Sequence, residues 1–416
     1  MNPFISKDAV VIGGGPAGLA AALELKRNGI NDILILEREE QLGGILNQCI
    51  HDGFGLIRFS EALTGPEYAG RDIEEIKQKE IDIKQGAMVV DMNANREITV
   101  TGYGEWVQYR AGAIILAMGC RERPRGAISI PGARPAGIFT AGVVQNLINI
   151  KNIMVGKRVV ILGSGDIGLI MARRLTLEGA EVLAVIEKLP FPGGLPRNIT
   201  QCLDDFGIPL LLSHTITTIH GKERVTGVTV SKVNEQGQAI KGSEIQYDCD
   251  TLILSVGLIP ENELSLRSGI FLDKNTGGPI VDQYLQTQVP GIFACGNVLH
   301  VHDMVDYVSR EGKRAGACAA CFIKNPIELS TCGQDVKAGD GVRYVVPQKI
   351  STDEDVDFSL RVALPFRKKS ILWKDGDRII KSSFFQRLQP AEMIRMTLKS
   401  QDLRGITALR VEVGDE

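Results

Sequence analysis

Short apolar runs, each four or five residues long and ending at glycine or an acidic residue, recur along the chain. Residues 9–12 and 33–36 are two such runs, built from Val, Ile, Leu and Ala, which is typical of parallel strands buried on both faces. Between them, residues 19–26 have the pattern of a helix that Asn28 and Gly29 would end. The pattern predicts a strand–helix–strand unit within about 30 residues.

The same pattern returns 150 residues later. A strand is expected at 158–162, a glycine-rich turn at 163–168, a helix at 169–178 and a second strand at 182–186. We interpret this as a second nucleotide-binding unit, and therefore as an internal duplication rather than an array of many repeats.

Two further apolar runs also end in glycine, at residues 114–119 and 251–257, and a third, at 291–297, ends in Gly296-Asn297. A helix rich in small residues is expected at about 303–322. Prolines and glycines concentrate at 124–135, which indicates a connection between domains.

The chain changes character beyond about residue 331. Pro390 is placed to open an amphipathic helix, and Asp375-Gly376 is a turn signal. Short strands are predicted at 358–364, 370–373, 378–385 and 406–413. We therefore expect a small α+β appendage.

Composition excludes several classes of protein. The 416 residues include 47 basic and 50 acidic side chains, so the net charge is −3 and no basic stripe offers itself to nucleic acid. No apolar run reaches the roughly 18 residues that span a membrane, so no direct membrane insertion is expected. The eight cysteines follow no framework spacing, which favours reduced thiols and a cytoplasmic location. The 46 glycines indicate tight turns where backbone approaches a ligand.

The first glycine turn, residues 13–18, has the complete setting of a dinucleotide site. It follows a strand, opens a helix, and has an acidic residue 19 positions beyond its last glycine. The glycines permit a sharp turn, backbone approach to a pyrophosphate and close helix–strand packing, while the helix N-terminus supplies positive charge and the acid accepts from ribose hydroxyls. The residues assigned to this site are Gly13, Gly15, Pro16, Ala17, Gly18, Glu37 and Arg38.

The second turn has the same setting and its own acid, Glu187, which favours NAD(H) over NADP(H) because a carboxylate repels a 2′-phosphate. Lys188 weakens that preference, since a lysine can meet the phosphate. The residues assigned here are Gly163, Gly165, Asp166, Ile167, Gly168 and Glu187.

The order of these features resembles the two-dinucleotide-binding-domain flavoproteins, the glutathione-reductase-like superfamily. The resemblance rests on the two glycine turns together with Ala117-Met118-Gly119, Val256-Gly257 and the run 291–297. It implies an α/β fold of two Rossmann-like domains, with an NAD(P)-binding domain (131–260) inserted in an FAD-binding domain (1–130 and 261–330), followed by the appendage (331–416). Asn297 departs from the family's usual aspartate, although its carbonyl oxygen can still accept from a ribityl hydroxyl. Further cofactor-binding residues that the resemblance implies are Gly43, Gly44, Gln48, Val89, Ala117, Gly119, Gly257, Gly296, Asn297, Val305 and Asp306.

A narrower resemblance lies in residues 43–55, 119–126 and 294–303, which look like the flavoproteins that accompany anaerobic glycerol-3-phosphate dehydrogenase. The flavin-binding chains of proline dehydrogenase and hydrogen cyanide synthase are more distant likenesses. The resemblance implies hydride exchange between NAD(H) and FAD, with electrons passing to or from a partner such as glycerol-3-phosphate dehydrogenase. It is also compatible with a homo-oligomer. Two alternatives stay open: a flavin subunit that oxidises an amine or imino acid with little use of NAD, and a scaffold subunit whose FAD is idle.

Cys49 is the one cysteine in the segment where disulfide reductases of this superfamily carry a pair. A disulfide relay needs two thiols, so we expect no redox disulfide. Cys49 and His51 are the candidate catalytic residues, as a flavin-tuning thiol and a proton donor. The alternative, which we favour, is that both shape the FAD pocket.

His300 and His302, followed by Asp303 and Asp306, are of metal-ligand type. We favour flavin-pocket lining for this segment and expect no metal. Cys318 and Cys321, with Cys332 beyond, also suggest ligands, but a cluster needs about four. Neighbouring alanines and glycines favour helix packing instead.

Overall fold

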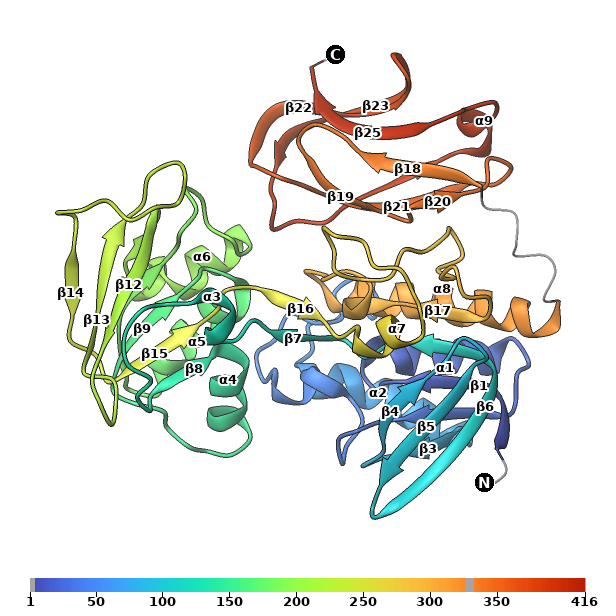
Figure 1. The fold of residues 1–416 in the computed structure, drawn as a ribbon, viewed down its shortest axis with the longest axis horizontal. Coiled ribbons are helices and arrows are strands. Elements are labelled where there is room, and N and C mark those ends of the chain that lie inside the picture. Colours follow the sequence, from blue (N-terminus) through green and yellow to red (C-terminus); the bar gives the residue numbers. More distant parts are fainter. Residues whose placement is uncertain (1–3, 326–332, 416) are drawn as a thin grey trace. The chain divides into compact units, whose positions relative to one another are not determined.

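The computed structural model describes residues 4–325 and 333–415 (Figure 1). Contacts divide the chain into two compact units, Met1–Cys120 with Pro260–Glu416, and Arg121–Ile259. Each unit carries one sheet with the parallel strands of the dinucleotide-binding type, so the expected α/β class with two Rossmann-like folds is confirmed. The detailed domain boundaries stay predictions, and the one expected at residue 330 lies outside the described residues, as does Cys332.

The first unit is built on a seven-stranded sheet in the order β3-β2-β1-β6-β5-β4, with β17 also paired to β6. Strands β3, β2, β1, β6 and β17 run parallel, and β5 and β4 join antiparallel. The strands are β1 (Ile5–Ile12), β2 (Ile33–Leu36), β3 (Asp82–Lys84), β4 (Met88–Met92), β5 (Glu97–Gly102), β6 (Glu105–Leu116) and β17 (Ile292–Ala294). β1, β2 and β17 are fully buried where the sequence is most apolar, which is the pattern of a sheet covered on both faces.

Two helices of this sheet, α1 (Pro16–Arg27) and α8 (Val305–Lys324), pack at very short range. A Cβ atom added at Gly312 would lie 2.2 Å from the Ala17 carbonyl oxygen, and one at Gly316 would lie 2.3 Å from the Ala21 oxygen. The small residues expected in this helix therefore have a packing role. Cys318 is half-buried against the same core, whereas Cys321 is exposed. The remaining helical segments of the first unit outside the appendage are η1 (Gly44–Gln48), α2 (Gly65–Gln78), α7 (Glu263–Arg267) and η3 (Gly296–Val298).

The second unit has a fully parallel sheet in the order β11-β10-β9-β15-β8 and an antiparallel sheet, β12-β13-β14. Its strands are β8 (Ile138–Thr140), β9 (Arg158–Leu162), β10 (Glu181–Ile186), β11 (Leu210–Leu211), β12 (His214–His220), β13 (Gly227–Lys232), β14 (Ile245–Tyr247) and β15 (Thr251–Leu254). Its helices are α3 (Arg125–Ile128), α4 (Ala141–Asn149), α5 (Asp166–Leu177), α6 (Pro196–Cys202) and η2 (Asp204–Phe206). Where the chain passes between the units, β7 (Cys120–Glu122) pairs with β16 (Leu258–Pro260).

The appendage consists of a five-stranded sheet, β20-β18-β25-β22-β23, and a three-stranded sheet, β19-β21-β24, around a core that includes the fully buried Trp373. The elements are β18 (Gln334–Ala338), β19 (Val342–Val346), β20 (Lys349–Ile350), β21 (Val356–Val362), β22 (Phe366–Asp375), β23 (Arg378–Leu388), β24 (Ile394–Leu398), α9 (Ser400–Leu403) and β25 (Leu409–Gly414).

The prediction of a helix beginning at Pro390 is wrong, because β24 occupies that stretch. The guanidinium of Arg361 donates to the carbonyl oxygens of Pro390 and Ala391, which a helix would need for its own ladder. Ile394–Leu398 instead pairs with β21, and Leu398 is fully buried. Long-range pairing therefore overrides the local helix signal.

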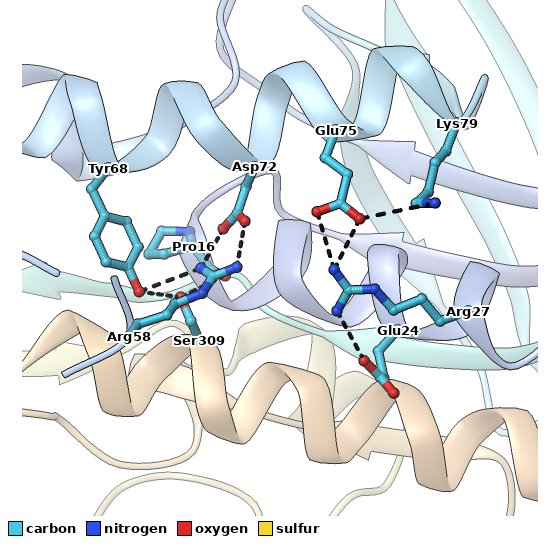
Figure 2. Close-up of polar contacts among 9 residues, drawn as sticks. All are labelled: Pro16, Glu24, Arg27, Arg58, Tyr68, Asp72, Glu75, Lys79 and Ser309. Atoms are coloured by element: carbon cyan, nitrogen blue, oxygen red, sulfur yellow. Dashed lines mark hydrogen bonds and ion pairs between the residues drawn. The ribbon is translucent and has the colours of Figure 1, made fainter. Parts of the chain in front are cut away.

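A buried ion pair ties the loop after η1 to α2 (Figure 2). Arg58 forms a bidentate pair with Asp72, at 2.7 and 2.5 Å, and contacts the Tyr68 hydroxyl. Tyr68 donates to Ser309 of α8 at 2.9 Å, and Ser309 contacts the Pro16 carbonyl at 3.5 Å. Burial lowers the pKa of Arg58, but the hydrogen bonds and charge of Asp72 outweigh it and raise that pKa. One network therefore joins this loop, α2, α8 and the start of α1.

We predict that Arg58→Met destabilises the protein by about 3–5 kcal/mol, because it leaves the Asp72 carboxylate buried without its partner. The free energy of unfolding of the full chain, from urea titration, checks this value. Arg27→Met is the matched control, since Arg27 of α1 pairs with Glu75 of α2 and with Glu24 of its own helix but is partly exposed (Figure 2). It should cost at most about 1 kcal/mol. Equal effects of the two substitutions would contradict the prediction.

Candidate dinucleotide sites

The first glycine turn brings backbone into direct contact between neighbouring strands. Gly13 has a φ of +109°, and a Cβ atom there would lie 2.4 Å from the Ala117 carbonyl oxygen. A Cβ at Gly18 would lie 1.9 Å from the Gly13 oxygen. Gly15, at the N-cap of α1, has no atom within 4 Å of its Cβ position, so the backbone there is open to an approaching group. This geometry fits a pyrophosphate above the N-terminus of α1.

Glu37 lies at the end of β2 and is only 6% exposed. Its carboxylate accepts from the backbone N–H of Gly14 at 2.7 Å and of Glu39 at 2.9 Å. These two bonds hold the acid beside the glycine turn, where the sequence places a ribose-binding residue. Arg38 is exposed and lies 3.7 Å from Glu39.

The second unit reproduces these contacts at positions 150 residues later. A Cβ at Gly163 would lie 2.1 Å from the Ser255 carbonyl oxygen, and a Cβ at Gly168 would lie 2.6 Å from the Ser255 Cβ. Glu187 accepts from the Ser164 N–H at 3.0 Å, the Ser164 hydroxyl at 2.6 Å and the Leu189 N–H at 2.9 Å. Both assigned acids are therefore fixed in the same way beside their own turns.

The duplication extends beyond the two turns and their acids. Gly43 donates its N–H to the Gly14 carbonyl at 2.8 Å, and Gly193 donates to the Ser164 hydroxyl at 2.8 Å. Each pair Gly43-Gly44 and Gly193-Gly194 begins six residues after the glutamate of its unit. That repeated spacing is visible in the sequence and would have added Gly193 and Gly194 to the second site.

The first residues of α5 are positioned from the loop that follows Gly194. Asp166 accepts from the Leu195 N–H at 2.8 Å and from the Asn198 side-chain amide at 2.6 Å. Ile167 packs against the core of the second unit. Gly257, with a φ of +102°, accepts from the Arg123 N–H.

The segment expected to meet the ribityl chain lies against the first turn. A Cβ at Gly296 would lie 2.8 Å from the Ala17 Cβ. The Asn297 carbonyl oxygen accepts from the His302 N–H at 3.0 Å, and its amide lies 3.6 Å from the Cys120 sulfur. Asn297, which stands where the family usually has aspartate, is thus held by local contacts. Its part in ribityl binding stays a prediction.

The other cofactor-binding residues assigned to the first unit differ from one another in their contacts and burial. Gly44 lies against Gly15, since its Cβ position is 3.2 Å from the Gly15 Cα. Gln48 and Val89 are buried, and Ala117 and Gly119 follow β6. Val305 opens α8, and Asp306 accepts from the Arg58 N–H at 2.8 Å.

Cys49 and His51 lie in the loop after η1. The Cys49 thiol donates to the Ile45 carbonyl at 3.3 Å, and its own carbonyl accepts from Gly65. The His51 ring is tilted against Phe54, with centroids 5.0 Å apart. These contacts are compatible with shaping a pocket, and the catalytic assignments stay predictions.

Among the described residues, Cys202, Cys249, Cys295, Cys318 and Cys321 are free thiols. Burial raises the pKa of Cys202 and Cys249 to about 11 and that of Cys318 to about 12, and it raises the pKa of Cys295 well above its usual range. These four thiols are therefore protonated at neutral pH and are poor nucleophiles.

His300 and His302 converge on Glu311, nine residues beyond His302 on α8. Glu311 was not among the residues expected from the sequence, because only the acids next to the histidines were considered. Burial would raise the pKa of Glu311, but the two histidines outweigh it and hold that pKa well below its usual range. Burial lowers the pKa of His302.

Known proteins share this architecture. The thioredoxin reductase of T. acidophilum superposes with a TM-score of 0.63 at 23% identity, covering 76% of this chain and 98% of that one. Thioredoxin reductase of Listeria monocytogenes is 26% identical over 294 residues, 70% of this chain and 85% of its own. Hydrogen cyanide synthase subunit HcnB of Pseudomonas protegens is 26% identical over 318 residues, 71% of this chain.

The match to several relatives is partial. It spans 66% of the length of HcnB and 61% of an opine oxidase subunit of Agrobacterium tumefaciens. Among the described residues, no helix is long and apolar enough to cross a membrane. Residues 7–317 match the sequence model of the family described as pyridine nucleotide-disulphide oxidoreductase. The two matched glycine turns and this coverage together show that the chain belongs to the pyridine nucleotide-disulphide oxidoreductase family, whose members are FAD- and NAD(P)H-dependent oxidoreductases.

Proposed function

We propose that this chain exchanges hydride between NAD(H) and FAD and passes electrons to or from a partner protein in the cytoplasm. The observation that carries the proposal is the matched geometry of the two turns, each with its own buried glutamate held by two backbone N–H groups. A second turn that had lost its function would have no reason to keep Glu187 in this arrangement.

FAD supplies the group that takes up or releases hydride when it is bound. The role of the protein chain is to bind and orient the two dinucleotides and to exclude water from them. Gly13 and Gly15 give the backbone access that a pyrophosphate needs, and Glu37 offers its carboxylate to ribose hydroxyls.

The proposal includes no redox disulfide, although the family is named for that chemistry. Cys49 stands alone in its segment, and burial keeps the Cys318 thiol protonated by raising its pKa. A thiol relay requires two cysteines close enough to bond and at least one reactive thiolate.

An alternative function is direct oxidation of an amine or imino acid. The opine oxidase subunit is a relative at 25% identity, and L-proline dehydrogenase of P. horikoshii shares the fold with a TM-score of 0.54. The intact second turn favours use of NAD(H), and anaerobic reduction of the flavin separates the two functions.

We predict that anaerobic mixing of the FAD-loaded protein with NADH bleaches the flavin absorbance. The reason is that each unit has a glycine turn with its own buried glutamate, as the proposed binding of both dinucleotides requires. Stopped-flow absorbance at the flavin maximum measures the change. Bleaching by a cyclic imino acid but not by NADH would support the alternative, and bleaching by neither would leave a scaffold subunit.

Glu187 also bears on the choice between NAD(H) and NADP(H). Its carboxylate is 8% exposed and is fixed beside the turn. The Lys188 side chain lies over the turn at Gly237, where an added Cβ would be 3.1 Å from its Nζ. This placement leaves the glutamate as the charge beside the expected ribose, which supports NAD(H).

We predict that Glu187→Gln shifts the ratio of kcat/KM for NADH over NADPH toward NADPH by about 10- to 100-fold, since a charged hydrogen bond and a charge repulsion are both lost. Steady-state reduction of an artificial acceptor with each nucleotide gives the ratio. Glu178→Gln is the control, because Glu178 pairs with Arg174 on the surface at the end of α5. An unchanged ratio in Glu187→Gln would contradict the assignment.

We further propose that the appendage docks the partner, for which the narrower resemblance suggests a glycerol-3-phosphate dehydrogenase. The hairpin of β22 and β23 contains seven basic and two acidic residues between Phe366 and Leu388. β23 ends its sheet (Figure 1). Ile379 and Phe384 on this strand are about half exposed. A basic edge strand with exposed apolar side chains suits an acidic partner surface.

We predict that the double substitution Arg378→Glu/Arg387→Glu weakens binding of purified glycerol-3-phosphate dehydrogenase by about tenfold or more, because like charges across an interface are costly. Surface plasmon resonance at low salt measures the affinity. Lys222→Glu, an exposed substitution in the second unit, is the control. Equal binding by all three proteins would sink the docking proposal, and self-association of the wild type would point to a homo-oligomer instead.

A further inference from the structure

Two imidazoles and one carboxylate form a buried cluster where the segment after η3 meets α8. His300 Nε2 lies 2.8 Å from Glu311 Oε1, and His302 Nε2 lies 3.1 Å from Glu311 Oε2. The histidine side chains are 0% exposed and that of Glu311 is 9% exposed. Their ligand atoms all lie within 4.8 Å of one another. We propose that His300, His302 and Glu311 bind one divalent transition-metal ion of the Zn²⁺ type.

The spacing of the donor atoms is close to what such an ion requires. Zinc binds imidazole nitrogen and carboxylate oxygen at about 2.0–2.2 Å, so ligand atoms around a tetrahedral ion stand roughly 3.3–3.6 Å apart. The separations of 2.8 and 3.1 Å, which involve the two different oxygens of Glu311, fall short of that range by up to about half an ångström. Binding of an ion therefore requires the side chains to move apart by about that distance.

Hydrogen bonds alone would give similar distances, but they leave the cluster poorly satisfied. If both rings donate through Nε2, then His300 Nδ1 and His302 Nδ1 are acceptors, and each is buried without a hydrogen-bond partner among the described residues. Asp303 Oδ1 and Asp306 Oδ2, in the same segment, are also buried acceptors without a hydrogen-bonded donor there. Four acceptors cannot satisfy one another, with or without direct contact.

Metal ligation through Nε2 changes this balance. Each Nδ1 then carries a proton and becomes a donor, as the second nitrogen of a metal-bound histidine normally does. In each ring Nε2, and not Nδ1, faces the Glu311 carboxylate, as ligation through Nε2 requires. The orientation of both rings is thus a second observation that is consistent with a bound ion.

The charges around the cluster also leave room for a cation. Glu311, Asp303 and Asp306 are buried acids, while the nearby arginines are Arg361, 3.5 Å from Asp303, and Arg395, whose guanidinium stacks on Tyr307. Arg395, with Arg310 and Arg343 farther out, opposes a cation, whereas the Glu311 carboxylate lies within hydrogen-bond distance of both imidazoles.

The donor set identifies the class of metal. Two imidazoles with one carboxylate suit borderline ions such as Zn²⁺, Co²⁺ or Fe²⁺ rather than Mg²⁺ or Ca²⁺, which prefer oxygen. Three protein ligands leave a fourth position for water. The ion would tie the segment after η3 to α8, independently of the proposed hydride exchange.

The full chain with its FAD, stripped with a chelator and dialysed, tests the proposal when titrated with Co²⁺ and, separately, with Zn²⁺. We expect one equivalent of metal per chain by elemental analysis, and visible d–d bands of Co²⁺ at longer wavelength than the flavin absorbs. His302→Gln should weaken Zn²⁺ binding by more than the roughly 10–100-fold typical of losing an outer-shell partner. His220→Gln, whose imidazole bonds to Thr229 on β13, should bind as the wild type does.

Flavin content and circular dichroism establish that each variant is folded. If His302→Gln does not fold, the wild-type cobalt spectrum decides alone. A folded wild type that binds less than about one tenth of an equivalent and shows no cobalt bands would overturn the proposal, as would undiminished binding by folded His302→Gln. Either result would leave the cluster as a hydrogen-bonded group.

Discussion

The structure depends on close approaches between backbone segments that leave no room for a side chain. At Gly13 and Gly163, the turns after β1 and β9 come so close to the neighbouring strand end that a Cβ would lie 2.4 or 2.1 Å from a carbonyl oxygen. That approach lets the helix begin directly over the sheet and aims its first N–H groups at one point. Residues that are distant in sequence then gather there, including Glu37 and the Gly43-Gly44 pair in the first unit.

A second close approach supports the first. Gly312 and Gly316 let α8 lie against the backbone of α1, and Ser309 of α8 reaches the Pro16 carbonyl at the start of α1. The buried pair of Arg58 and Asp72 extends this support to the loop that carries Cys49 and His51. The helix that would face a pyrophosphate is thus held by packing on one side and by a charged network on the other.

Much of this could be predicted from the sequence, because strong local patterns and their spacing are preserved in the fold. The strands around both turns, the turns themselves and Glu37 and Glu187 lie where apolar runs and glycines indicated. The antiparallel β4 and β5 and the strand β24 were missed, since their pairing partners are far away or their local signal favours a helix. Glu311 was missed for a related reason: its role arises only when one helix folds back onto an earlier segment.

The equal spacing in the two units has a mechanical consequence. In each, the Gly-Gly pair begins six positions after the glutamate, and its first glycine bonds back to the residue after the first glycine of the turn. The segment from the glutamate to the Gly-Gly pair therefore has a fixed length and is attached at one end to a strand and at the other to the glycine turn. An insertion within it would detach one of its two attached ends, so the fold tolerates substitutions in this segment more readily than a change in its length.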